Sequence, residues 1–314
     1  MFKLVCKSRG VAWECIAIAA FALMLFAQPA AAGEENGKTF EAPGATIYYE
    51  VTGSGAGNTL IVVNGGPGFE HSYMHIATAW DALGKNHQVV FYDQRGNGRS
   101  VGDHKGQTQT LKDQIDDLEA LRAHLGVERL DLLGHSWGGY LVMAYAAVHP
   151  DRVAHLIIVD SAAPKIKDTR FLFDDVFPEV TERQASFAFA DELGDKAATA
   201  ASLREYWTML CYSPEKGQEL AARIPPTVLN KDVNKAVFAD LDRYDLNPEI
   251  RKFKFPTLVI TGRYDMNVAP VVAYKIHQGI PGSKFLVFER SGHFPFYEEP
   301  EAFVKAVEEF LAGK

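Results

Sequence analysis

The chain has 314 residues, of which 47% are hydrophobic and 23% are charged, a composition typical of a globular protein with one large core. Its formal net charge is −8, and no cluster of Lys and Arg offsets that charge locally. These values exclude nucleic acid as an expected partner.

The first 32 residues have the pattern of an export signal. Three basic residues within the first nine positions precede the apolar run Cys15–Ala27, and the small residues Ala30–Ala32 form a cleavage site before Gly33. An uncleaved membrane anchor is the alternative, which the shortness of the run disfavours. We expect residues 1–32 to be a signal peptide and the mature protein to be periplasmic or secreted, without stable membrane insertion.

From residue 33 onward, apolar runs of strand length alternate with segments of helical pattern. The expected strands are Ile47–Val51, Leu60–Val63, Val89–Tyr92, Leu130–Leu133, Leu156–Val159, Thr257–Thr261 and Phe285–Phe288. The expected helices lie near 110–125, 138–149, 268–279 and 300–312. This alternation predicts an α/β fold, a mostly parallel sheet with helices on both faces. Several runs are continuous Val, Ile and Leu, as is typical of strands buried on both faces.

The alternation stops between about Pro164 and Phe253, where the sequence is helical in character and punctuated by prolines. A stretch of that length is too long for a loop between strands. We therefore expect a helical cap at residues 166–252, inserted between a first part of the core at 33–165 and a second part at 253–314.

The segment Gly134-His135-Ser136-Trp137-Gly138 joins an expected strand directly to an expected helix. The pattern Gly-x-Ser-x-Gly in that context is typical of a nucleophile elbow, a sharp turn that exposes a serine hydroxyl at a strand end. Gly98-Arg99-Ser100-Val101-Gly102 fits the same pattern, but Ser100 lies well past its strand and polar residues follow it. Context therefore favours Ser136 over Ser100 as the nucleophile.

A serine nucleophile needs a base and a carboxylate that orients the base. In this architecture the expected chain order is serine, acid, histidine. Asp265 and His293 each follow an expected strand through a short loop that contains glycine. We predict Asp265 as the acid and His293 as the base, with Asp160, which ends another strand, as the rival acid.

An oxyanion hole needs two backbone N–H groups directed at the developing charge. We expect one from Trp137, the residue after the nucleophile, and one from Gly66 in the turn Asn64–Gly68. His71 and His75 flank that turn, and His71 is a candidate for the substrate pocket.

These residues resemble the prolyl aminopeptidase (proline iminopeptidase) branch of the α/β-hydrolases. The resemblance rests on Gly65–Gly68, the Asp-Gln-Arg-Gly segment from Asp93 to Ser100, the elbow through Gly139, and Gly262–Asp265. It implies a Ser136–Asp265–His293 triad, an oxyanion hole at Gly66 and Trp137, and a structural loop around Ser100. It also implies cleavage of an N-terminal residue, usually proline, with cap glutamates that hold the free amino group.

The sequence departs from that family at two points. Asn64 stands where the family usually has histidine, and the cap lacks a tryptophan-rich segment with its glutamate. Glu205, beside Tyr206 and Trp207, is the candidate that would bind the substrate amine, although a solvated helix face is an equal alternative. The other cap glutamates are Glu179, Glu182, Glu215 and Glu219.

The sequence thus predicts an exported serine hydrolase that forms an acyl-enzyme with a small molecule or short peptide. An aminopeptidase is the first hypothesis, and a carboxylesterase or lactonase with the same triad is the second. A cap carboxylate facing Ser136 would favour the first, and an apolar cap cavity the second. A binding protein on a hydrolase scaffold is a third hypothesis, which the intact triad order disfavours. The oligomeric state is left open.

No cofactor or metal is expected from the sequence. Cys211 is the single cysteine outside the predicted signal peptide, so neither an internal disulfide nor a cysteine-based metal site can form there. Its simplest role is that of a small buried apolar side chain.

Overall fold

A computed structural model describes residues 37–55, 57–102, 109–225 and 228–313 of the chain. The predicted signal peptide, residues 1–32, lies outside the described residues. Within the described ranges, none of the helices combines the length and the apolar character needed to span a bilayer.

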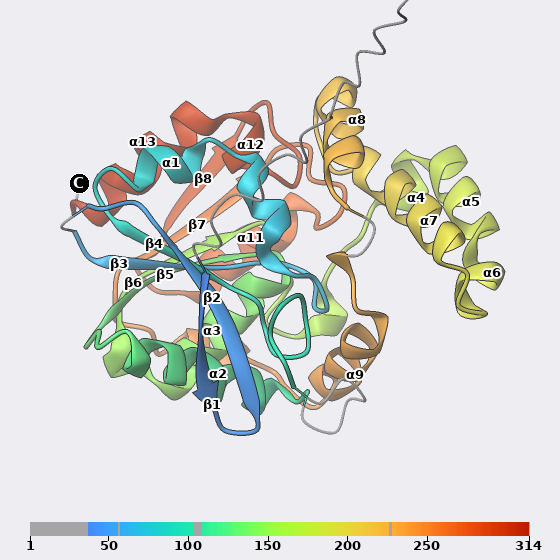
Figure 1. Ribbon diagram of the computed structural model, residues 1–314. Coiled ribbons are helices and arrows are strands. Elements are labelled where there is room, and N and C mark those ends of the chain that lie inside the picture. The colour runs from blue at the N-terminus through green and yellow to red at the C-terminus, as the bar shows by residue number, and fades with distance from the viewer. Residues whose placement is uncertain (1–36, 56, 103–108, 226–227, 314) are drawn as a thin grey trace, which may run out of the picture. The chain divides into compact units, whose positions relative to one another are not determined.

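The centre of the described structure is an eight-stranded sheet (Figure 1). In chain order the strands are β1 Gly37–Ala42, β2 Ala45–Thr52, β3 Thr59–Val63, β4 Gln88–Tyr92, β5 Leu130–His135, β6 Val153–Val159, β7 Thr257–Gly262 and β8 Lys284–Phe288. Across the sheet their order is β1-β2-β4-β3-β5-β6-β7-β8. The pairs β1·β2 and β2·β4 are antiparallel and the other pairs are parallel. The predicted α/β fold with a mostly parallel sheet is confirmed.

The burial of each strand follows from its place in the sheet. Every residue of β3, β5 and β7 is buried, because helices cover both faces there. Within β3, Ile61 and Val63 belong to one hydrophobic cluster, while Leu60 and Val62 belong to a second cluster on the opposite face. The edge strands β1 and β8 are partly exposed. Strand β1 was not predicted, because its apolar pattern is short and weak.

Helices from both halves of the chain cover the two faces of the sheet. These elements are η1 His71–Ile76, α1 Ala79–Leu83, α2 Leu111–His124, α3 Trp137–Val148, η2 Pro150–Arg152, α11 Pro270–Gly279, α12 Pro295–Glu298 and α13 Pro300–Leu311. Side chains of α2, α3 and α11 belong to the first hydrophobic cluster, and side chains of α1 and α13 belong to the second. The four predicted core helices are therefore present, each with bounds within two residues of those expected.

The segment at 166–252 forms helices in its described part. They are η3 Ile166–Asp168, α4 Phe173–Val176, α5 Pro178–Ser186, α6 Ala188–Glu192, α7 Lys196–Thr208, α8 Pro214–Arg223, α9 Lys231–Leu241 and α10 Asn247–Ile250. Side-chain caps begin three of them: Asp195 for α7, Ser213 for α8 and Asn230 for α9. Helix α7 packs against α5, α6 and α8 (Figure 1). Helices α4, α5 and α6 contain no buried residue, so this part of the cap is held by few apolar contacts.

Candidate active site

Ser136 lies at the turn between β5 and α3, with φ 57° and ψ −121°. A residue with a side chain rarely adopts this backbone conformation, and such strain is concentrated at functional sites. The flanking glycines permit the turn. A Cβ on Gly134 would lie 2.3 Å from the carbonyl oxygen of Gly138, and a Cβ on Gly138 would lie 2.1 Å from that of Val63. The local structure therefore has the geometry of a nucleophile elbow.

His293 and Asp265 come together in the loops that follow β8 and β7. The Nδ1–H of His293 donates to Asp265 Oδ2 over 2.8 Å. Asp265 Oδ1 accepts the backbone N–H groups of Asn267 at 2.9 Å and Val268 at 2.8 Å, which fixes the carboxylate. The rival acid, Asp160, instead accepts the N–H of Gly262 at 2.9 Å. Of the two candidates, Asp265 is the one hydrogen-bonded to the imidazole.

The electrostatics of this group follow from its burial. Burial lowers the pKa of His293 to about 4, so the imidazole is neutral at pH 7 and can accept a proton. Burial likewise raises the pKa of Asp265 to about 8, against the effect of its backbone N–H donors. Burial and the nearby Asp265 raise the pKa of Asp160 well above its usual value. One atom each of Asp160, Asp265 and His293 lie within 4.8 Å of one another, so the two carboxyls hold fewer than two charges.

Ser136 and His293 line the same small cavity at the end of the sheet. In the described ranges, however, no hydrogen bond joins Ser136 Oγ to His293 Nε2. The side-chain amide of Asn267 donates to that Nε2 instead, over 3.0 Å. Catalytic hydrogen bonds are often long or poorly aligned before a substrate binds, so this arrangement is compatible with a Ser–His pair. Sequence reasoning missed Asn267, which has no motif of its own.

The two predicted oxyanion donors lie beside Ser136. Gly66 and Trp137 line one cavity with it, and a Cβ on Gly65 would come within 2.9 Å of Ser136 Cβ. Neither the Gly66 nor the Trp137 backbone N–H donates to another group among the residues that the structure describes. Two free N–H groups beside a serine hydroxyl can stabilise an oxyanion.

Gln94 links the two segments that carry these donors. Its side-chain amide donates to the Asn64 carbonyl over 3.0 Å, and its Oε1 accepts the indole N–H of Trp137 over 2.8 Å. The Asn64 side chain donates to the carbonyls of Gly65 at 3.0 Å and Phe69 at 2.9 Å. Asparagine thus braces the turn from the position where the family usually has histidine.

Ser100, the second match to the elbow pattern, has a structural environment. It is buried, its hydroxyl accepts the Tyr48 N–H over 2.9 Å, and it donates to the Asp93 carbonyl over 2.6 Å. Both its donor and acceptor capacities are used within the fold, as expected for a structural loop.

A buried hydrogen-bond chain connects the oxyanion turn to the histidine loop. The Gly65 N–H donates to Tyr73 Oη over 2.5 Å, the Tyr73 hydroxyl donates to His135 Nδ1 over 3.2 Å, and His135 Nε2–H donates to the His293 carbonyl over 2.8 Å. Burial lowers the pKa of His135 well below its usual value, so its ring is neutral and serves as one donor and one acceptor. No sequence motif indicated these hydrogen bonds, because Tyr73, His135 and His293 lie far apart in the sequence.

The comparison with protein families agrees with this geometry. Residues 58–300 match the model of the family described as alpha/beta hydrolase fold. The chain belongs to the alpha/beta hydrolase fold family.

Several known proteins are similar to this chain over most of its length. A proline iminopeptidase of Saccharolobus solfataricus is 28% identical over 280 residues, covering 85% of this chain and 89% of its own. A proline iminopeptidase of Clostridium botulinum is 28% identical, covering 84% and 94%. The enol-lactonase of Burkholderia xenovorans superposes with a TM-score of 0.65 at 23% identity, covering 88% of this chain and 100% of its own. The chain is a hydrolase, and the resemblance to the prolyl aminopeptidase type is confirmed.

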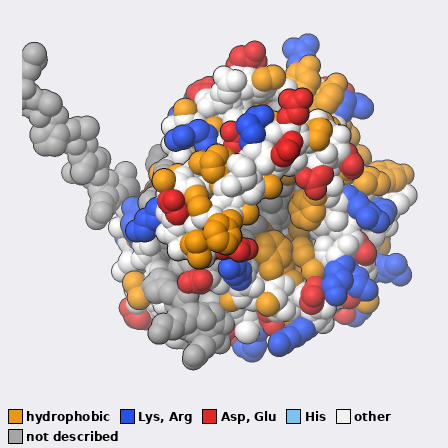
Figure 2. All heavy atoms as spheres, turned by 90° about the vertical axis from the view of Figure 1, so that its right-hand side faces the viewer, with side chains coloured by type: hydrophobic (Ala, Val, Ile, Leu, Met, Phe, Trp, Pro, Cys, Tyr) orange, Lys and Arg blue, Asp and Glu red, His pale blue; other side chains and the backbone are white. Residues whose placement is uncertain are grey.

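The cavity that contains Ser136 in this hydrolase has a volume of about 260 Å³ and is mainly apolar. Core and cap both contribute to its wall: Gly66, Pro67, Phe69, Trp137, Ala162, Ile166, Thr169, Phe171, Leu203, Tyr206, Leu229, Asn234, Phe238, Asn267 and Val268. None of these described lining residues carries a charge. Figure 2 faces the cap side of the molecule, where hydrophobic side chains gather near the centre with charged ones around them.

Two predicted substrate-binding residues do not line this cavity. The Glu205 carboxylate forms an ion pair with Arg183 over 3.2 Å, because α5 and α7 pack side by side in the cap. His71 is fully buried and its Nδ1–H donates to Asp93 over 2.6 Å. The structure thus places neither residue in the wall of the Ser136 cavity, and a role for either in substrate binding stays a prediction.

Glu298 is a further buried group that the sequence did not indicate. Its carboxylate accepts the N–H groups of Gly292 at 2.6 Å and Tyr212 at 2.8 Å, thereby joining the histidine loop to the cap. The His293 N–H donates to the Leu210 carbonyl over 2.7 Å at the same junction. Burial outweighs these N–H donors and raises the pKa of Glu298 to about 7. The position of the candidate base thus depends on the end of α7 as well as on the core.

Proposed function

We propose that this hydrolase is a serine hydrolase with Ser136 as nucleophile, His293 as base and Asp265 as the orienting acid. In the first step, His293 exchanges its contact with Asn267 for Ser136 Oγ, takes the hydroxyl proton, and Ser136 attacks the substrate carbonyl. The N–H groups of Gly66 and Trp137 stabilise the oxyanion. His293 then protonates the leaving group, and water activated by the same imidazole hydrolyses the acyl-enzyme.

The uncharged wall of the cavity around Ser136 is the observation that supports the proposed substrate class. Its described wall contains no carboxylate, and its polar groups are the neutral side chains of Thr169, Tyr206, Asn234 and Asn267. A substrate ammonium placed there would lose its hydration without gaining a counter-charge, which is costly. We infer that the preferred substrates are esters or lactones with a compact, uncharged, apolar acyl group.

An aminopeptidase is the second candidate, and two observations favour it. The proline iminopeptidases described above are similar to this chain over most of its length. A neighbouring cavity of about 490 Å³ shares Phe171, Tyr206 and Asn267 with the Ser136 cavity, and it also contains Asp174 and Asp191. Asp191 already pairs with Lys231. Asp174 is therefore the carboxylate that would bind a substrate amine.

Parallel hydrolysis of a short-chain aryl ester and a proline arylamide tests the two candidates. The proposal expects ester cleavage at a kcat/KM at least about tenfold above that for the arylamide, with both activities abolished in Ser136→Ala. A preference for the arylamide that disappears when its amino group is blocked, and that falls in Asp174→Asn, would replace the esterase by the aminopeptidase. Ester cleavage that persists in Ser136→Ala would overturn the proposed nucleophile.

We also propose that the protein is exported, on the pattern of its first 32 residues. Cell fractionation followed by N-terminal sequencing of the recovered protein tests this. The expected result is a protein outside the cytoplasm that begins at Gly33. A full-length chain in the cytoplasmic fraction would contradict the proposal.

A further inference from the structure

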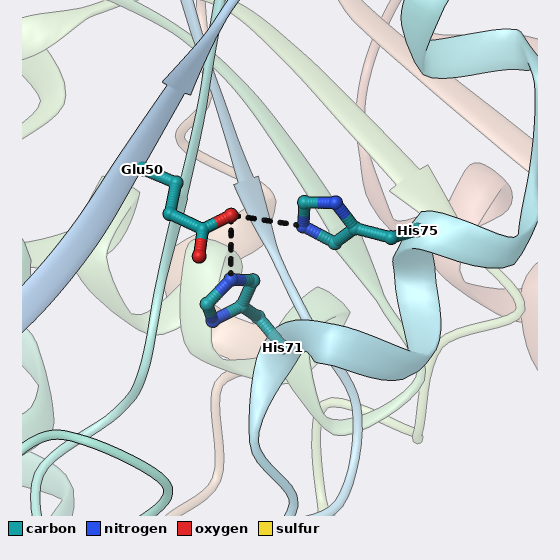
Figure 3. A group of neighbouring side chains, drawn as sticks. All are labelled: Glu50, His71 and His75. Atoms are coloured by element: carbon teal, nitrogen blue, oxygen red, sulfur yellow. Dashed lines mark ion pairs between the residues drawn. The ribbon is translucent and has the colours of Figure 1, made fainter. Parts of the chain in front are cut away.

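Glu50, His71 and His75 form a cluster outside the Ser136 cavity (Figure 3). Glu50 projects from β2, and the two histidines project from η1, the short helix that follows the oxyanion turn. Glu50 Oε2 lies 3.5 Å from His71 Nε2 and 3.6 Å from His75 Nε2. One ligand atom from each residue lies within 4.8 Å of the others, close enough for a single ion to contact all three.

The surroundings of His71 leave one nitrogen available to a ligand. Its Nδ1–H donates to Asp93 Oδ1 over 2.6 Å, while its Nε2 is buried and has no hydrogen-bond partner among the described residues. Its nearest acceptor is Glu50 Oε2 at 3.5 Å, which is too long for a good hydrogen bond, and a buried polar atom without one calls for an explanation. A carboxylate behind the histidine is the arrangement that orients the imidazole in metal sites and makes it a stronger ligand.

The surroundings of Glu50 likewise occupy one carboxylate oxygen, Oε1, and leave the other, Oε2, available to a ligand. Glu50 Oε1 accepts from the Tyr48 hydroxyl over 2.7 Å and from the Arg99 guanidinium over 3.1 Å. Those bonds hold the carboxylate and leave Oε2 directed at the two histidines. The His75 side chain is 38% exposed, so the cluster opens to solvent on that side.

We propose that Glu50, His71 and His75 bind one divalent transition-metal ion of the zinc type, with water at the open position. Two imidazole nitrogens and one carboxylate oxygen are ligands of Zn²⁺, at metal–ligand distances of about 2.0–2.2 Å. In a tetrahedral site, ligands at such distances are about 3.4 Å apart, close to the observed 3.5 and 3.6 Å. Mg²⁺ and Ca²⁺ prefer oxygen ligands and fit this set poorly.

A protonated His71 between two carboxylates is the competing explanation. Burial lowers the pKa of His71, but the carboxylates of Asp93 and Glu50 outweigh it and raise this pKa to about 9. A bound ion would displace that proton. The ion would also tie β2 to η1, and His71 already anchors η1 through its backbone N–H to Asp93 at 3.0 Å. The ion would thereby hold η1, the helix that follows the oxyanion turn, against β2.

Direct metal binding by the full chain after treatment with a chelator tests the proposal. Calorimetric titration with Zn²⁺ and visible absorption with Co²⁺ should each give one ion per chain, with a Co²⁺ spectrum of tetrahedral type. His75→Ala and Glu50→Gln should each lower the affinity at least about tenfold. The control is His149→Ala, which removes a half-buried histidine at the end of α3 and should leave the affinity unchanged.

The outcomes separate the explanations. Absence of stoichiometric binding by the wild-type chain would overturn the site and leave the protonated His71. Binding that His75→Ala does not weaken would place the ion elsewhere and also overturn it. The metal-free melting temperature of His75→Ala should agree with that of the wild type within a few degrees, because the His75 side chain is exposed. If His75→Ala keeps its melting temperature but no longer gives the Co²⁺ spectrum, the loss is due to the missing imidazole ligand and not to unfolding.

Discussion

The elbow and the cap contribute to one cavity but are held in place differently. Around Ser136, a buried sheet, a buried helix and glycines with no space for a Cβ fix the backbone. In the cap, α7 and α9 line the cavity and bury only a few side chains each, and the neighbouring helices α4, α5 and α6 contain no buried residue. The difference indicates that packing tightly constrains the Ser136 turn, whereas the cap side of the cavity is formed by less buried helices whose lining residues can change with less loss of stability.

The largest expected effect is a loss of catalytic activity without a loss of folding, in the variant Ser136→Ala. Ser136→Ala should lower kcat at least about 10,000-fold, because the remaining groups only bind and polarise the substrate. Steady-state kinetics with an aryl ester measure the loss of kcat, and a thermal melt tests whether the fold is kept. Ser100→Ala is the matched control: it should cost about 1–3 kcal/mol of stability, since it leaves the Tyr48 N–H without its acceptor. A kcat per folded molecule that falls equally in both variants would contradict the assignment.

Tyr73→Phe tests the buried chain between the oxyanion turn and the histidine loop. The change removes the acceptor of the Gly65 N–H and the donor to His135 Nδ1. A small displacement of the oxyanion donors should lower kcat about 100-fold, with KM much less affected. Burst kinetics would assign the loss to the acylation step. A loss that appears only in KM would show that Tyr73 acts on substrate binding instead.

Phe238→Ala tests whether the cap sets the preference for the acyl group, because it enlarges the cavity and leaves the catalytic residues unchanged. Phe238 lines the Ser136 cavity and is 39% exposed, so its removal enlarges the space for the acyl group with little cost in packing. The ratio of kcat/KM for a longer acyl ester to that for an acetyl ester should rise about tenfold. The melting temperature should stay within a few degrees of wild type. An unchanged ratio would mean that the acyl group does not reach α9.

The pH dependence of kcat/KM examines the buried histidine without any substitution. Because burial lowers the pKa of His293, the base stays neutral and active below pH 6.5 and is lost only as the pH falls toward about 4. At pH 5.5 the enzyme should therefore be about tenfold more active than one with an ordinary histidine base. Thermal melts at each pH exclude acid unfolding as the cause. An acidic half-point at or above 6.5 would contradict the predicted shift.

The sequence predicted the elements of the core well but did not predict the partners of the cap side chains, and the reason is physical. Continuous apolar runs and glycine-flanked turns report local constraints, so seven of the strands and the elbow could be read directly. Cap glutamates carry no such local signal. Glu205 looked suited to bind an amine, but its charge is paired with Arg183 from a helix more than twenty residues earlier. The edge strand β1 escaped notice because half of its residues face solvent.

The sequence by itself determined the α/β order of the elements, the strained turn at Ser136 and the succession of serine, acid and histidine, because each rests on residue types and short spacings. Only the tertiary structure decided which carboxylate contacts His293, that Asn267 contacts its Nε2, and that the Ser136 cavity lacks charge. It alone brought Glu50 to His71 and His75. These are contacts between distant segments, and the register of the sheet and the packing of helices upon it determine them.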